Sequence, residues 1–204
     1  MTLVRNLTAL MIFSLCATQL FSSVEPLETE RLELRQARLS DTHDLAKIIL
    51  DPEVRKLTGL FPARVQTVDG VQTFISDFLI GNSEQNIAPK YPISWVVVEK
   101  ESQETIGLVT FAGVAMHDKR AELAYAFNPK YWNKGYATEA CKKVLSYGFC
   151  QQGLHRIYAT VDPQNVASKR VLEKINMSLE GLLRHYMIVN GQYRDRAMYA
   201  IIAD

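Results

Sequence analysis

The sequence predicts a single α/β (α+β) domain built on a mixed sheet with helices on both faces. Two observations support this fold class. Apolar residues alternate with period two in several short segments, as in strands, and recur at helical spacing in others. These segments follow one another in the order strand, two helices, three strands, helix, strand, helix, two strands, which favours one layered domain.

The N-terminal part of the domain supplies one strand and two helices. Leu32 and Leu34 alternate with charged residues, which predicts a half-buried first strand. Residues 40–50 predict a helix that ends at the Asp-Pro pair beginning at Asp51, and a loop is expected after it. Thr67 is the expected N-cap of a second helix that stops near residue 81.

The C-terminal part alternates between strands and helices. The expected elements are strands at 93–99, 105–113 and 121–127, a helix at 137–148, a strand at 155–161, a helix at 165–175, and strands at 179–189 and 193–201. The last two strands flank the dipeptide Asn190-Gly191, a strong hairpin signal.

Composition excludes several classes of function. The chain has 204 residues, a formal net charge of +1 and Lys and Arg spread along its length, which makes nucleic acid an unexpected partner. The three cysteines have neither disulfide-framework nor metal-ligand spacing, and the four histidines form no local cluster. We therefore expect no metal and a reducing compartment.

Residues 1–23 form a hydrophobic extension that precedes a domain at residues 24–204. One positive charge and an interrupted apolar run are similar to a secretory signal peptide, and the run is short for a transmembrane helix. A frayed extension, a misassigned start and a membrane-surface anchor are alternatives. A cytoplasmic protein is expected unless this segment directs export, and membrane contact only if it is retained as an anchor.

The most informative stretch is residues 131–140, where a strand that ends at an Asn-Pro turn is followed by a glycine-containing loop and then a helix. Such a junction presents free backbone N–H groups at the positive end of the helix dipole, so it can bind an anion such as a diphosphate. Gly135 allows close approach to the backbone, and Lys134 adds a cation. Alternatively, Gly135 only shapes a turn and Lys134 is solvated.

The spacing Trp132-x-x-Gly135-x-Ala137 resembles the acyl-CoA loop of the GNAT superfamily of N-acetyltransferases. Residues 131–140 are most similar to the ribosomal-protein N-terminal acetyltransferase (RimJ/RimL-like) branch, where Trp often replaces the usual Gln or Arg. The resemblance extends over about residues 27–204. It implies the GNAT fold, a mostly antiparallel seven-stranded sheet splayed between its fourth and fifth strands to admit the cofactor.

This resemblance implies acetyl-CoA as the co-substrate. The loop backbone would hold its diphosphate, and the exposed edge of residues 124–127 would pair with the pantetheine amides as an added strand does. The residues expected to contact acetyl-CoA are Ala124, Tyr125, Ala126, Phe127, Trp132, Asn133, Lys134, Gly135, Tyr136, Ala137, Thr138, Asn165 and Ser168.

Asn165 and Ser168 follow the strand at 155–161. Asn165 is a natural N-cap for the next helix, and the resemblance adds a contact with the pantetheine, a compatible role. Many family members place a tyrosine acid where this chain has Leu172. The resemblance implies that Ser168 instead protonates the departing thiolate.

Glu122 is the expected general base. It is a lone carboxylate in an otherwise apolar strand, which calls for a reason, and it would act through water on the incoming ammonium. The alternative is that Glu122 points to solvent or pairs with Lys119 or Arg120.

The expected reaction is direct attack by a primary amine on acetyl-CoA within a ternary complex. A protein N-terminal amine is the favoured acceptor, since its pKa lies about 2 units below that of lysine and deprotonation costs roughly 3 kcal/mol less. A polyamine or aminoglycoside-type amine, an inactive acyl-CoA-binding module and an exported interaction protein are alternatives. The acceptor side is expected at residues 61–85 and 184–195, where Tyr186, Tyr193 and Asp195 could line it or only pack across strands. A monomer or homodimer fits the sequence.

Overall fold

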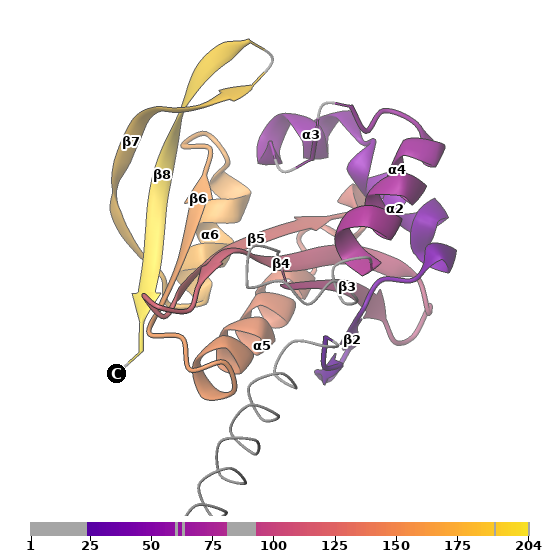
Figure 1. The fold of residues 1–204 in the computed structure, drawn as a ribbon, viewed down its shortest axis with the longest axis horizontal. Coiled ribbons are helices and arrows are strands. Elements are labelled where there is room, and N and C mark those ends of the chain that lie inside the picture. Colours follow the sequence, from indigo (N-terminus) through magenta and orange to yellow (C-terminus); the bar gives the residue numbers. More distant parts are fainter. Residues whose placement is uncertain (1–23, 60, 63, 81–92, 190, 204) are drawn as a thin grey trace, which may run out of the picture.

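The computed structural model describes residues 24–59, 61–62, 64–80, 93–189 and 191–203 (Figure 1). The extension at residues 1–23 and the expected end of the second helix near residue 81 lie outside these residues. Within the described part of the chain, no helix is long and apolar enough to cross a membrane.

Eight strands of the described chain form one mixed sheet in the order β1-β2-β3-β4-β5-β6-β8-β7. The β5–β6 pair is parallel and the other neighbours are antiparallel. The bounds are β1 (Leu27–Glu28), β2 (Leu32–Arg35), β3 (Ile93–Glu99), β4 (Thr105–Ala115), β5 (Arg120–Phe127), β6 (Arg156–Val161), β7 (Ser178–Val189) and β8 (Gln192–Ile202). The expected fold is confirmed, with the short β1 added to the seven strands predicted.

Helices cover both faces of the sheet, as predicted (Figure 1). They are the 3₁₀ helices η2 (Leu39–Asp41) and η5 (Pro129–Tyr131), the π-helix η3 (Ile75–Ile80), and the α-helices α2 (Thr42–Ile49), α3 (Pro52–Thr58), α4 (Val68–Phe74), α5 (Tyr136–Cys150) and α6 (Val166–Lys174). Helices α5 and α6 contribute to one buried core and α2, α3 and α4 to the other.

The central strands separate the two cores by alternation. Trp95 and Val97 of β3 are buried in the core under α5, whereas Val96 and Val98 are buried in the core under α2. Successive side chains of a strand point to opposite faces, so a strand covered on both faces is apolar throughout. That is why residues 93–99 contain a continuous apolar run.

Helix α3 corrects the prediction of a loop after residue 50. Asp51 is its N-cap, and the carboxylate accepts hydrogen bonds from the N–H groups of Glu53 (2.9 Å) and Val54 (3.0 Å). Pro52 takes the first helical position, where its missing N–H costs nothing. The Asp-Pro pair therefore starts a new helix as well as ending α2.

Strands β5 and β6 pair over only three registered positions, the last of which is Glu122 opposite Tyr158. Beyond this point the two strands run apart in Figure 1. They are the fourth and fifth of the seven strands predicted, so the expected splay is present. It begins at the residue expected to be the base.

Candidate functional site

The loop before α5 presents free hydrogen-bond donors. Gly135 is the N-cap of α5 at φ 83°, and Asn133 also has a positive φ of 61°. The first N–H of the helix with a backbone acceptor is that of Glu139, which donates to Gly135 O (3.0 Å). In the described chain the N–H groups of residues 136–138 have no acceptor, so this helix start can bind an anion.

Arg31 holds this loop from the carbonyl side. Its Nη1 donates to Lys134 O (3.0 Å), its Nε donates to Glu139 Oε2 (2.7 Å), and its guanidinium lies 4.4 Å from the centre of the Tyr136 ring. Burial would raise the pKa of Glu139, but hydrogen bonds from Thr29 and Arg31 outweigh burial and lower it. Glu139 is therefore ionised, and its ion pair with Arg31 anchors the loop. No local sequence pattern marks Arg31 for this role.

Trp132 ties the loop to the end of β5. Its Nε1 donates to Phe127 O (2.8 Å), and its ring packs against both cores. The indole N–H is thus already bonded to the protein backbone. At Gly135 an added Cβ would meet only Arg31 Nη2, at 3.5 Å, so the backbone here is open.

The register of β5 identifies the backbone groups that face the splay. Asn128 N–H bonds to β4 (2.9 Å), and hydrogen-bonded pairs alternate along antiparallel strands. The backbone groups of Ala124 and Ala126 therefore face β4, whereas those of Tyr125 and Phe127 face β6. This assigns to Tyr125 and Phe127 the strand edge expected from residues 124–127.

A cavity of about 260 Å³ opens where β5 and β6 separate. It brings together both predicted catalytic residues, Glu122 and Ser168, with Asn165. Its lining is Leu57, Thr58, Gly59, Glu122, Leu123, Ala124, Tyr125, Ala159, Thr160, Val161, Asn165, Ser168, Leu172, Tyr186, Met187 and Arg196.

The polar residues of this cavity are held by short hydrogen bonds. Thr160 Oγ1 donates to Glu122 Oε1 (2.7 Å), so the carboxylate is fixed at the splay. Asn165 accepts from Ser168 N–H (3.0 Å) as the N-cap of α6. Burial raises the pKa of Tyr125, and its protonated hydroxyl donates to Ser168 O (3.2 Å).

The hairpin of β7 and β8 closes the cavity through a bulge. The register shifts between Leu183 and Met187, and His185 has a positive φ of 51° there. Asp195 accepts the His185 N–H (2.9 Å) and thereby stabilises the bulge. A bulge redirects side chains, and Met187 lines the cavity beyond it.

Of the three hairpin residues singled out from the sequence, Tyr186 lines the cavity and Asp195 supports the bulge. Tyr193 is 63% exposed, stacks on His185 and is not among the lining residues. Tyr193 therefore matches the alternative expectation, which was packing across the two strands.

Arg196 is a cavity residue that sequence reasoning missed. Its side chain is almost fully buried, with 4% exposure, and donates from Nε to Met187 Sδ (3.0 Å) and from Nη2 to Thr58 O (3.0 Å). Burial lowers its pKa. The available signal was an arginine directly before the apolar run of the last strand, which is compatible with many roles.

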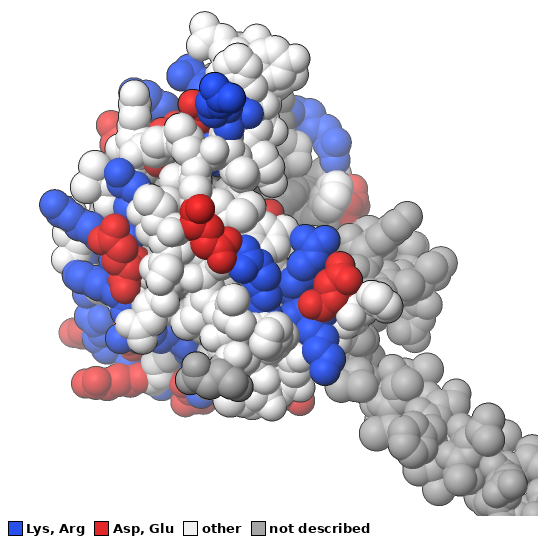
Figure 2. All heavy atoms as spheres, turned by 90° about the vertical axis from the view of Figure 1, so that its left-hand side faces the viewer, with Lys and Arg blue, Asp and Glu red and all other residues white. Residues whose placement is uncertain are grey.

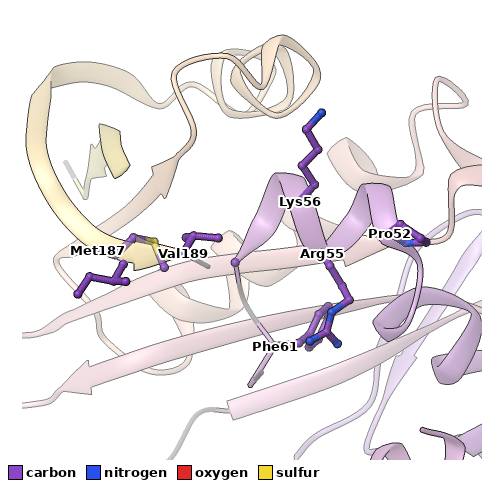
Figure 3. A pocket seen from close by; sticks show the side chains of 8 residues that line it. Pro52, Arg55, Lys56, Phe61, Met187 and Val189 are labelled. Atoms are coloured by element: carbon purple, nitrogen blue, oxygen red, sulfur yellow. The ribbon is translucent and has the colours of Figure 1, made fainter. Parts of the chain in front are cut away.

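A second cavity of about 260 Å³ lies beside the first, and Gly59 and Met187 line both (Figure 3). Arg55 and Lys56 leave α3 on opposite sides in Figure 3. The residues that line this cavity are Pro52, Arg55, Lys56, Gly59, Phe61, Met187, Ile188 and Val189. Thus Phe61 and the hairpin, both expected on the acceptor side, line the same cavity.

The face that bears β7 carries charged side chains of both signs (Figure 2). Lys and Arg lie interspersed with Asp and Glu in Figure 2. Among the described residues, no group of three His, Cys, Asp or Glu side chains is arranged to hold a metal ion.

Comparison with known proteins identifies the family. Residues 31–178 match the model of the acetyltransferase (GNAT) domain. An N-acetyltransferase of Bacillus subtilis, YoaA, is 35% identical over 178 residues, which cover 86% of this chain and 96% of that protein. The spermidine N(1)-acetyltransferase of Escherichia coli is 36% identical over 99 residues, 48% of this chain and 53% of that protein.

Solved structures support the same family assignment. A GNAT-family acetyltransferase from Bacillus anthracis has 31% identity and a TM-score of 0.74, and the match covers 87% of this chain and 98% of that one. The ribosomal-protein α-N-acetyltransferase RimL in complex with coenzyme A has the same fold at 20% identity and a TM-score of 0.74, with 87% and 98% covered. The chain therefore belongs to the GNAT family and is an acetyl-CoA-dependent N-acetyltransferase.

Proposed function

We propose that this enzyme acetylates a protein N-terminal α-amine by direct attack on acetyl-CoA in a ternary complex. One observation carries the proposal: the sheet opens at Glu122 into a cavity that also contains Ser168, and the same strand leads to the anion-binding loop. A donor laid along β5 would have its diphosphate at one end and its thioester at the other.

The residues present fit acetyl-CoA. The free N–H groups at the start of α5 suit the diphosphate, and Lys134 can add a cation. The backbone edge at Tyr125 and Phe127 suits the pantetheine amides. From Glu122 to Phe127 the strand rises by about 17 Å, which separates the diphosphate site from the reacting end.

Glu122 and Ser168 divide the proton transfers. The Glu122 carboxylate accepts a proton from the incoming ammonium through water, and the freed amine attacks the thioester carbon. The Ser168 hydroxyl gives its proton to the thiolate as the carbon–sulfur bond breaks, and it regains a proton from the attacking nitrogen, which must lose one to become the amide. The hydrogen bond from Thr160 keeps Glu122 beside the attacking amine.

The second candidate acceptor is a polyamine, because the spermidine acetyltransferase is 36% identical over half of this chain. A polyamine would enter a cavity that contains the buried Arg196 guanidinium, and like charges repel in such a setting. The N-terminal amine reduces this cost because it carries a single charge.

The test uses the full chain and two measurements. Calorimetry with acetyl-CoA should show saturable binding to the wild type that Gly135→Glu loses, because a carboxylate would project at the loop. Mass spectrometry of a peptide that begins with Ser should show acetylation of its α-amine. This acetylation should be faster than that of spermidine. Binding without acetylation of any amine would support a non-catalytic acyl-CoA-binding module instead.

A further inference from the structure

The Arg196 guanidinium lacks a carboxylate partner in the described part of the chain. No ion pair within 4.0 Å is formed there, and its two hydrogen bonds go to a thioether, in Met187, and a backbone carbonyl, in Thr58. Arginine is almost never fully buried unless it is paired. A buried guanidinium without a directly bonded carboxylate is therefore a feature that requires a cause.

Arg196 lines the cavity and has hydrogen-bond donors that are not used within the described part of the chain. Among the described residues, every fully buried side-chain nitrogen or oxygen has a hydrogen-bond partner. Arg196 Nη1 has none, so it keeps contact with accessible space, and Arg196 is one of the cavity-lining residues. A guanidinium has five N–H donors in a fixed plane, and the free ones can bind a carboxylate.

The guanidinium is mounted rigidly. Its Nη2 bonds to Thr58 O at the C-terminal end of α3, and an added Cβ at Gly59 would lie 2.8 Å from the same nitrogen. Glu122 and Asp162 both act electrostatically on Arg196 and raise its pKa, against the larger lowering by burial. An arginine stays charged under these conditions.

We propose that Arg196 binds a carboxylate of the acceptor, so that the preferred N-terminus carries an acidic side chain in its first two residues. This inference rests on the proposed function. Glu122 attracts the ammonium and Arg196 attracts a nearby carboxylate in the same cavity. The adjoining cavity, with Lys56 in its lining, continues the path for the peptide chain.

The test compares peptides that differ only in one charge. The wild type is assayed by kcat/KM on peptides beginning Ser-Asp, Ser-Asn, Asp-Gly and Asn-Gly, with spermidine alongside. In at least one pair the acidic peptide should exceed its amide by about 10- to 100-fold, as for a hydrogen bond to a charged group. Equal values in both pairs would overturn the proposal while leaving N-terminal acetylation intact.

Arg196→Gln should abolish this preference, so that the variant's kcat/KM for Ser-Asp falls to its own value for Ser-Asn, and Arg196→Lys should keep part of it. Arg156→Gln is the matched control, because its guanidinium pairs with Glu180 away from the cavity lining. A purely structural Arg196 would instead lower the melting temperature and leave the preference unchanged. Acetylation of spermidine and of no peptide would overturn the proposed function and this inference together.

Discussion

Asp41 and Arg196 are almost equally buried, at 5% and 4% exposure, yet their charges are compensated differently. Asp41 accepts two hydrogen bonds from Arg35 (2.9 and 2.8 Å) and one from Thr105 Oγ1 (3.0 Å). Arg196 meets a sulfur and a carbonyl. The paired charge of Asp41 indicates a residue that stabilises the fold. The charge of Arg196, which has no carboxylate bonded to it, indicates a residue that binds a ligand.

Asp41→Asn should destabilise the protein by about 3 kcal/mol, because it leaves the Arg35 guanidinium without its counter-charge. Burial would raise the pKa of Asp41, but hydrogen bonds from Arg35, Arg38 and Thr105 outweigh it and lower the pKa. The carboxylate therefore stabilises the fold above about pH 4, its ordinary range. This contribution is lost as the pH falls through the lowered pKa.

Thermal unfolding at pH 7 and at steps down to pH 2 measures this effect. The wild type should melt above Asp41→Asn at pH 7, and the gap should shrink below about pH 4. Asp118→Asn is the control, since its carboxylate is half exposed and pairs at the surface with Arg120. A gap that is independent of pH would contradict the assignment.

Glu122→Gln should lower kcat by about 100-fold or more, because an amide cannot accept the ammonium proton. Ser168→Ala should cost less, about tenfold, since a thiolate leaves with little assistance. Glu122→Gln should keep the acetyl-CoA affinity and Ser168→Ala should keep most of it, because the diphosphate binds at the loop. Rapid-quench kinetics and calorimetry separate the two quantities. Unchanged turnover in Glu122→Gln would leave Glu122 with only its hydrogen bond to Thr160.

At the scale of elements, the strand, loop and helix from β5 to α5 depend on a residue far away in the sequence. Arg31, before β2, binds Lys134 O and Glu139 together. Arg31→Ala should weaken acetyl-CoA binding by about 5- to 20-fold, because the loop must then be ordered by the ligand. Calorimetry checks this, with Lys100→Ala, paired to Glu28 nearby, as control. Equal losses of acetyl-CoA affinity in both variants would show that the loss does not depend on the contacts of Arg31 with the loop.

Local patterns predicted most elements because their causes are local. The strand predicted at residues 93–99 coincides with β3, and Thr67 caps α4 through a hydrogen bond from Gly70 N–H (3.1 Å). Asn176, directly after the end of α6, has φ 64°, a left-handed conformation that asparagine tolerates at a helix end. Helix α3 was missed because an Asp-Pro pair fits both the end of one helix and the start of the next.

The site was only partly predictable for the same physical reason. Gly135 and Asn165 belong to local motifs, so sequence sufficed to place them at helix starts. Arg196, Met187 and Thr58 come from three segments that meet only through tertiary packing. Their shared cavity depends on the β7 bulge and the end of α3, which no short-range pattern specifies.

At the scale of the whole molecule, strand pairing inside the sheet is shortest where the substrates would bind, and only the two-residue edge strand β1 pairs over fewer positions. The β4–β5 pair has seven registered positions and β6–β8 has six, whereas β5–β6 has three. Acetyl-CoA placed in this opening would contact β5, α5 and α6. The ligand would thus join the two halves of the sheet, and binding should be visible as global stabilisation.

Acetyl-CoA at 100 times its Kd should raise the melting temperature by about 5–10 °C. Such saturation adds about 2.7 kcal/mol to stability, and a domain of this size shifts by about 2–4 °C per kcal/mol. Gly135→Glu should lose this increase in melting temperature. Asp41→Asn should melt lower yet keep it, because none of the hydrogen bonds of Asp41 involves the loop or the cavity lining. An increment lost in Asp41→Asn would mean that binding and folding are coupled through the core rather than through the opening between β5 and β6.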